Sequence, residues 1–470
     1  MIRKAMAVVL AVGMILGLTA CGDTSDPGTS ISASASVSNT ESKAETKDTK
    51  TKDSETITAD RSIAVEEVNG TVTASDTTES FNPVKGEHLR SGQEVATKEQ
   101  SDLTLLLDSD KHAYAAELTR FALLAEGGPK STRTVLSLME GTLRSVIDNK
   151  LEPGESYEVT TPNASMAVRG TDFTVTVAQV NGVFVTTVNV DEGVVDVKAN
   201  IGNEEITRDL NPGDGLKISD TGVKELKKES NRKLLKKTQS NYSGGELMHY
   251  DIYTYSYDDN GFLLKEEIDT SAPFTTPSWY EYLNDADGNM IRKTMVYEGF
   301  GPDYYTEYEY DALGNMIRAT ERFAADDYPI IEYVYTYDQN SNKIEEVCPT
   351  DDPEVTPHRI KYSYDAAGNM LESVKTYLDG SAVMEREVRT YDDQGRITSC
   401  LKYDRDGAVY EEWADIRYDD RGNMTSRDQK GFSDYTNHIE LEYDDEDNLI
   451  KRTEVGSNGY SIVETYEYSE

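Results

Sequence analysis

The sequence predicts an all-β protein, in which a β-sandwich or β-roll domain is followed by an elongated, twisted array of antiparallel β-hairpins. Three observations support this prediction. A phrase of Tyr, Asp, two variable residues, Gly and Asn recurs through the second half of the chain. Short strand-like segments separated by glycine turns precede it. Of the 30 tyrosines, only Tyr114 and Tyr157 come before residue 240, so the aromatic side chains belong mainly to the repeats.

Residues 1–20 are predicted to be an export signal, because Arg3 and Lys4 precede a short apolar run. The segment Leu18–Cys21 has the pattern of a bacterial lipobox, in which Cys21 becomes the lipidated first residue. A plain cleavable signal with a chance cysteine is the alternative. The apolar run is shorter than the roughly 20 residues that a spanning helix needs. The expected result is an extracytoplasmic protein that two acyl chains anchor to the membrane.

Residues 21–60 are rich in Ser, Thr, Ala, Lys and Asp and contain almost no large apolar side chains. Such a segment cannot bury enough surface to offset the entropy of ordering it, so a disordered stalk is expected. On the order of 40 flexible residues give a typical reach of a few nanometres from the membrane.

Residues 61–220 alternate short β-type segments with glycine turns, a pattern typical of a sandwich or β-roll. The order of these segments resembles the FecR domain, and its most distinctive phrases are Thr161–Ala164 and Arg169–Thr171. The resemblance implies an extracytoplasmic β domain suited to protein contacts. Arg169 is either a partner or ligand contact or a turn arginine that braces neighbouring carbonyls and carboxylates. Residues 221–230 are predicted to be a linker, with a short helix from Lys224 as one form of it.

Residues 231–470 form the repeat array. The glycine position of the phrase falls at residues 261, 288, 314, 341, 368, 395, 422 and 447, so the steps are 27, 26, 27, 27, 27, 27 and 25 residues. Tyrosines alternate with polar residues before each turn, which predicts a strand with one aromatic face. Asp can cap its own turn and Gly or Asn accepts positive φ, so each unit is predicted to be a β-hairpin plus a connector.

The phrase resembles the YD repeats of the Rhs and teneurin type, over about half of the chain. The resemblance implies an antiparallel sheet that spirals. Because this array is short and is followed by no cargo segment, the expectation is an open β-spiral rather than a closed capsule. Open end strands are a pairing hazard, and the charges of Glu464–Glu470 are expected to discourage such pairing.

The regularly placed tyrosines are expected to form the core of the array through cross-strand pairs. Aromatic residues outside this register are the better candidates for ligand contacts. These ligand-binding candidates are Trp279, Tyr304, Tyr305, Tyr328, Trp413 and Tyr435, together with Arg169.

No catalytic residue and no metal site is predicted. The five histidines are dispersed, and no nucleophile elbow or phosphate loop is present. Turns such as Asp285–Gly288 and the segment Ser256–Glu267 place oxygens at spacings that suit calcium, but turn chemistry explains the same residues without a metal. Besides Cys21, Cys348 and Cys400 are expected to be free, buried thiols.

A net charge of −40 and a mean hydropathy of −0.62 describe a strongly acidic surface, which disfavours nucleic acid as a partner. The preferred hypothesis is a non-enzymatic, lipid-anchored surface protein used for adhesion or partner binding, with a surface protein or glycan as the partner. The alternatives are a carbohydrate- or cell-wall-binding module and an extracytoplasmic signal sensor of the FecR type.

Overall fold

The computed structural model describes residues 61–128, 131–168, 170–180, 182–226, 232–272, 276–299, 301–325, 327–350, 355–431 and 435–469. These residues form strands and turns in two compact units, and no helix among them is long and apolar enough to cross a membrane. The all-β prediction is therefore confirmed. The predicted signal, Cys21 and the stalk lie outside the described residues, as does Arg169.

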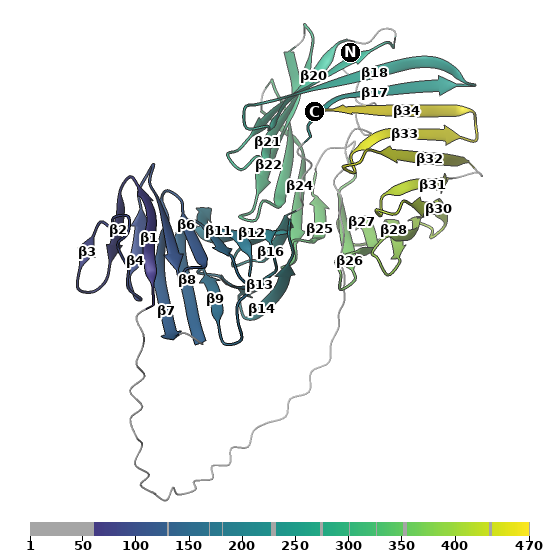
Figure 1. The fold of residues 1–470 in the computed structure, drawn as a ribbon. Coiled ribbons are helices and arrows are strands. Elements are labelled where there is room, and N and C mark those ends of the chain that lie inside the picture. The colour runs from purple at the N-terminus through teal and green to yellow at the C-terminus, as the bar shows by residue number, and fades with distance from the viewer. Residues whose placement is uncertain are drawn as a thin grey trace, which may run out of the picture. The chain divides into compact units, whose positions relative to one another are not determined.

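The first unit consists of strands β1–β16 (Figure 1). Their bounds are β1 (Ile63–Asn69), β2 (Val72–Ser75), β3 (Ser80–Phe81), β4 (Glu94–Thr97), β5 (Asp102–Leu107), β6 (Lys111–Ala115), β7 (Arg120–Gly128), β8 (Ser131–Ile147), β9 (Ser156–Thr160), β10 (Ala164–Val168), β11 (Asp172–Val180), β12 (Val183–Glu192), β13 (Val195–Ile201), β14 (Glu204–Leu210), β15 (Gly215–Ile218) and β16 (Val223–Leu226). Residues 223–226 were predicted to belong to the linker, but they pair with β15 and extend the sheet.

Strand β8 joins two sheets because its two halves have different neighbours. Its first half pairs with β7 and, in parallel, with β9, whereas its second half pairs with β6 and β11. The change occurs near Gly141, which has a φ of 88°. A Cβ at Gly141 would lie 2.4 Å from the Cα of Thr119, so this corner requires glycine.

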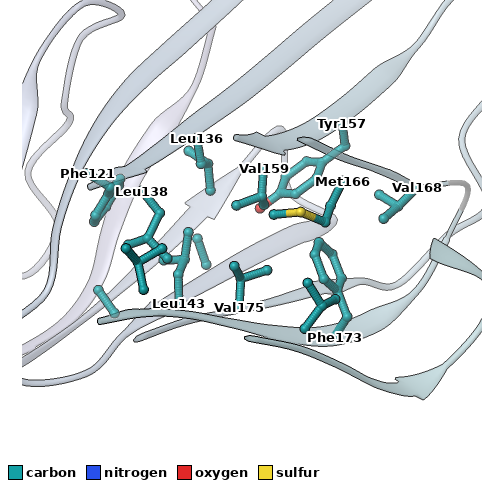
Figure 2. Close-up of a cluster of buried hydrophobic side chains, with 14 of the residues drawn as sticks. Phe121, Leu136, Leu138, Leu143, Tyr157, Val159, Met166, Val168, Phe173 and Val175 are labelled. Atoms are coloured by element: carbon teal, nitrogen blue, oxygen red, sulfur yellow. The ribbon is translucent and has the colours of Figure 1, made fainter. Parts of the chain in front are cut away.

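The apolar core of the first unit lies between these two sheets, and Figure 2 shows side chains from both meeting there. Strict alternation of buried and exposed positions, as along β13, places every second side chain in the core. Tyr157 is fully buried, and its hydroxyl donates to Oγ of Ser145 at 2.9 Å. The predicted sandwich is therefore observed, built as two sheets that share one long strand.

The second unit consists of strands β17–β34. Their bounds are β17 (Leu234–Ser243), β18 (Glu246–Tyr257), β19 (Leu263–Thr270), β20 (Ser278–Asn284), β21 (Met290–Tyr297), β22 (Gly301–Tyr310), β23 (Met316–Phe323), β24 (Pro329–Tyr337), β25 (Lys343–Cys348), β26 (His358–Tyr364), β27 (Met370–Tyr377), β28 (Val383–Tyr391), β29 (Ile397–Asp404), β30 (Val409–Tyr418), β31 (Met424–Lys430), β32 (Thr436–Tyr443), β33 (Leu449–Gly456) and β34 (Tyr460–Tyr468).

Seven of the eight predicted turns close their hairpins in the same way, and among the described residues the first turn, at Asp258, keeps only the bond from the Phe262 N–H. In the turn after β26, Asp365 Oδ1 accepts from the backbone N–H groups of Ala367 and Asn369, and Asp365 Oδ2 accepts from Asn369 Nδ2 at 2.9 Å. All eight marker positions have positive φ, including Ser341 at 61° and Asp447 at 65°. The turn prediction is thus confirmed even where the glycine is replaced.

The array is closed, whereas the sequence predicted an open spiral. Strand β34 pairs with β17 from Leu234↔Tyr468 to Ser243↔Tyr460, and Figure 1 shows the two strands side by side. The charges predicted to discourage such pairing instead stabilise it, because Glu464 accepts from Lys237 across the seam. Closure satisfies the backbone groups that two open edges would expose.

The closing pair is itself one repeat unit whose two halves come from opposite ends of the array. Every internal hairpin has a β-bulge at the tyrosine position, as in Tyr337↔Lys343 and Tyr364↔Met370. The pair Leu234↔Tyr468 has the same irregularity. The degenerate first unit predicted near residue 231 is therefore completed by the last strand, and eight hairpins and this closing pair form the closed sheet.

Candidate ligand-binding surfaces

The closed sheet has two unlike faces. The tyrosine face, which carries Tyr282, Tyr308 and Tyr335, also holds the fully buried Cys348 and Cys400. Burial raises the pKa of phenols on this face, for example those of Tyr310 and Tyr333 to about 12. The opposite face carries exposed ion pairs instead. The tyrosine face is therefore the interior of the closed sheet and the opposite face is its exterior.

A ladder of hydrogen bonds joins successive units at the repeat tyrosine. The Tyr337 hydroxyl donates to the Met316 carbonyl at 2.8 Å, and the Tyr310 hydroxyl donates to the Met290 carbonyl at 2.8 Å. The same bond recurs from Tyr257, Tyr364, Tyr418, Tyr443 and Tyr468. These tyrosines are structural, as the cross-strand prediction required, and their hydroxyl groups add a role that the sequence pattern did not reveal.

Inside the closed sheet, glutamates accept hydrogen bonds from tyrosines and pair with cations. Glu266 Oε2 accepts from the Tyr282 hydroxyl at 2.6 Å, and Lys293 Nζ lies 3.9 Å from the centroid of the Tyr280 ring. Burial lowers the pKa of Lys293, and the charge of Glu266 opposes that shift. These half-buried groups contact one another, so this part of the interior is a polar network.

Trp413 belongs to the interior, next to the free thiol of Cys400. The guanidinium carbon of Arg427 lies 3.6 Å from the Trp413 ring centroid, and Trp413 Nε1 donates to Glu411 at 3.0 Å. Burial and the charge of Arg452 lower the pKa of Arg427. The prediction of free, buried thiols is confirmed for Cys400 and for Cys348. The Trp413 ring is thus already engaged by a cation.

Two of the predicted aromatic contacts share the exterior face. Trp279 on β20 lies beside Lys265, whose Nζ is 4.9 Å from the ring centroid, and Tyr305 on β22 lies 4.5 Å from the guanidinium carbon of Arg292. Leu283 lies on the same face of β20 and is 54% exposed. These five residues, on four consecutive strands, are called the outer patch below.

The remaining candidates are dispersed. Tyr304 lies on the tyrosine face and packs against Phe323, with the ring centroids 5.1 Å apart. Tyr328, which is 64% exposed, and Tyr435 lie in connectors between hairpins. The structure therefore brings Trp279 and Tyr305 to one surface and separates them from the other aromatic candidates.

The distinctive Thr161–Ala164 phrase of the first unit has a structural role. Asn163 is buried, and its Nδ2 donates to the carbonyl oxygens of Phe184 at 3.0 Å and Ile218 at 3.1 Å. Its Oδ1 accepts from the hydroxyl of the buried Thr186 at 2.6 Å. The phrase therefore fastens the β9–β10 turn to the other sheet.

The turn aspartates have the oxygens that a calcium site in the array would use. Their oxygens accept hydrogen bonds within their own turns, as Asp285 does from Asp287 and Asn289. Within the described ranges, no group of three or more His, Cys, Asp or Glu residues is placed to hold a metal ion. Turn chemistry therefore accounts for the positions of these residues.

A cavity of about 490 Å³ lies between the first two turns of the array, and the sequence interpretation missed it. Residues of the first two hairpins line it: Asp258, Asn260, Phe262, Leu264, Tyr282, Leu283, Asn284, Asp285 and Ala286. Two departures from the repeat occur here. Phe262 stands where six of the other seven turns have Asn and the seventh has Arg396, and Asn284 stands where the other units have Tyr. The unusual residues at these two repeat positions could have predicted the cavity from the sequence.

Comparison with protein families supports the resemblance of the first unit. A family model described as "FecR protein" matches residues 93–196, which confirms the FecR resemblance over that range. No curated protein matches the chain.

Several solved structures are similar to this chain. A putative anti-sigma factor from Parabacteroides distasonis ATCC 8503 is 16% identical, with 30% of this chain and 66% of that chain covered and a TM-score of 0.24. A porin-like protein from Bacteroides uniformis ATCC 8492 is 11% identical, with 50% and 96% covered and a TM-score of 0.30. The TcdB2-TccC3-TEV structure is 10% identical, with 79% and 26% covered and a TM-score of 0.25. None of these likenesses carries a functional conclusion.

Proposed function

We propose that this chain is a non-enzymatic, extracytoplasmic binding protein that engages a surface protein through the exterior of its closed array. The observation that carries the proposal is the outer patch, in which Trp279 lies beside Lys265 and Tyr305 lies beside Arg292, with the exposed Leu283 on the same face. Trp, Tyr and Arg are the side chains that most often dominate the energy of protein interfaces. The pattern of residues 1–20 and Cys21 supports a lipid-tethered location for this surface.

Architecture also supports a binding role. Pairing of β17 with β34 leaves the array without an open edge, so a partner meets side chains rather than unpaired backbone. Ionisable groups at the seam are paired with one another, as Glu464 is with Lys237 and Arg452. A partner protein would therefore contact the side chains on the exterior face of the closed sheet.

The test is a binding screen of the purified full chain against envelope proteins and glycans. Trp279→Ala and Tyr305→Ala are each expected to weaken binding of a captured protein by about tenfold or more, the loss typical of an interface anchor. Tyr377→Ala is the control, because Tyr377 is 39% exposed on β27, away from the outer patch. Equal losses from all three variants would contradict the proposal, and hydrolytic turnover of an envelope polymer would overturn its non-enzymatic part.

A sensor of the FecR type is the second candidate, favoured by the family match over residues 93–196. Under this alternative the first unit receives a signal from a transporter or regulator. A neighbouring gene for a transporter or a sigma factor would support it, and pull-down of such a protein by the first unit's surface rather than by the outer patch would separate the two candidates. Retention on peptidoglycan or glycans in the screen would instead support a carbohydrate-binding role.

A further inference from the structure

We infer that the cavity between the first two turns of the array binds a small organic cation, an ammonium group on a short apolar arm. The cavity lies where two departures from the repeat, Phe262 and Asn284, occur in adjacent units. The inference goes beyond the proposed function, because the cavity shares Leu283 with the outer patch but does not include the rings of Trp279 and Tyr305.

The first departure opens the cavity. In the regular units a tyrosine ring extends across the start of the preceding strand, and its hydroxyl donates to a backbone carbonyl there. Asn284 takes the tyrosine position and keeps the bond, because its Nδ2 donates to the Leu263 carbonyl at 2.8 Å. The hydrogen bond is preserved without the ring, so the volume of the ring is left to the cavity.

The second departure leaves a carboxylate with an unused oxygen. In the regular turn at Asp365, Asn369 donates to the second aspartate oxygen at 2.9 Å. Phe262 occupies the corresponding position in the first turn and supplies only its backbone N–H, which donates to Asp258 Oδ1 at 2.8 Å. Among the described side chains, none donates to Asp258 Oδ2, and Asp258 lines the cavity.

The residues that line the cavity indicate the charge and the shape of the ligand that would bind there. Phe262 packs closely over the next turn, since a Cβ on Gly288 would lie 2.5 Å from its ring. Its aromatic surface, the free Asp258 oxygen and the side chains of Leu264 and Leu283 surround the same space. None of the described residues that line the cavity is cationic. A carboxylate beside an aromatic ring favours an ammonium group, and the leucines favour an apolar arm.

The experiment is a saturation-transfer NMR titration of the full chain at about physiological ionic strength, where weak surface attraction to the acidic protein is screened. The probes are n-butylammonium, the neutral isostere n-butanol and methyl glucoside. Butylammonium is expected to bind about tenfold or more tightly than butanol, because its hydrogen bond to the carboxylate is charge-assisted. Equal binding of butylammonium and butanol, or binding of the glucoside alone, would overturn the inference.

Variants locate the site. Asp258→Asn is expected to weaken butylammonium binding about tenfold, whereas Asp365→Asn, in a regular turn, leaves it unchanged. Asn284→Tyr restores the repeat residue, so it should fill the cavity and abolish binding while the melting temperature stays the same or rises. Unchanged affinity in Asn284→Tyr would refute the site even if the protein still captures a partner. Trp279→Ala should leave butylammonium binding intact, so failure of this inference and failure of the proposed function are distinguishable.

Discussion

The seam that closes the array makes a quantitative prediction about Glu464. Its carboxylate lies between three strands and accepts from Lys237 Nζ at 2.7 Å, Arg452 Nη1 at 3.0 Å and the Tyr466 hydroxyl at 3.3 Å. The residue is only 7% exposed. Glu464→Gln leaves the half-buried Lys237 without its carboxylate partner and leaves Arg452 with Glu454 alone, which costs about 3 kcal/mol. For a unit of this size, the melting temperature should fall by about 6 to 12 °C.

Glu467→Gln is the matched control. Glu467 also crosses the seam, with its carboxylate 2.7 Å from Lys236 Nζ, but its side chain is 60% exposed. Removal of such an exposed pair costs at most about 1 kcal/mol. Thermal unfolding followed by circular dichroism gives both values. Equal destabilisation by the two variants would refute the conclusion that the buried Glu464 contacts hold the seam.

The pH dependence of the stabilisation by Glu464 provides a second test. Burial alone would raise the pKa of Glu464, but the hydrogen bonds and charges of Lys237 and Arg452 lower it overall. A lowered folded-state pKa means that the stabilisation is present above the unfolded value and is lost as the pH falls through the folded value. The wild type and Glu464→Gln should therefore converge in stability under acid conditions, below about pH 4. A gap that stays constant with pH would contradict the charge assignment.

Three further predictions concern the repeat units. Tyr337→Phe removes the bond to the Met316 carbonyl and should cost about 1 to 2 kcal/mol in urea unfolding, whereas loss of no stability would contradict the tyrosine ladder. Burial raises the pKa of Cys400 to about 12, so a thiol reagent at pH 8 should label Cys400 only after unfolding, and rapid labelling of the native protein would contradict its burial. The hydrogen bond from Asn369 lowers the pKa of Asp365, so the stabilisation by the Asp365 carboxylate is present at neutral pH and is lost in acid. Asp365→Asn should therefore reduce the loss of stability between neutral and acid pH, and an unchanged loss would contradict the turn assignment.

Local features of the fold could be predicted from the sequence because turn chemistry is local. Asp at the first turn position and a residue that tolerates positive φ at the fourth determine each reversal within five residues. The rule held even at Ser341 and Asp447, where the glycine is missing. The alternation of tyrosines likewise predicted one aromatic face, and that face became the interior.

Features that depend on residues far apart in the chain were not predicted. Pairing of Leu234 with Tyr468 joins residues more than two hundred positions apart, and no local pattern distinguishes it from two open edges. The sequence distinguished the ligand candidates from the core tyrosines only by their position in the repeat. The face of the sheet that a side chain occupies also depends on each β-bulge that precedes it in the strand. Trp413 and Trp279 therefore appeared equivalent in the sequence, although one lies inside the closed sheet and the other outside.

The repeat brings the two end strands together, and the Glu464 contacts then stabilise the seam. Each hairpin has the same bulge beside its tyrosine, so each unit adds the same local change in the direction of the sheet. Tyr468 makes the ladder bond to the Leu449 carbonyl at 3.0 Å, and Tyr257 makes it to the Leu234 carbonyl at 2.8 Å, so the first and last strands behave as halves of an ordinary unit. The number of units, rather than any residue at the ends, then decides whether β34 meets β17, and removal of one internal hairpin should open the ring while leaving each remaining turn intact.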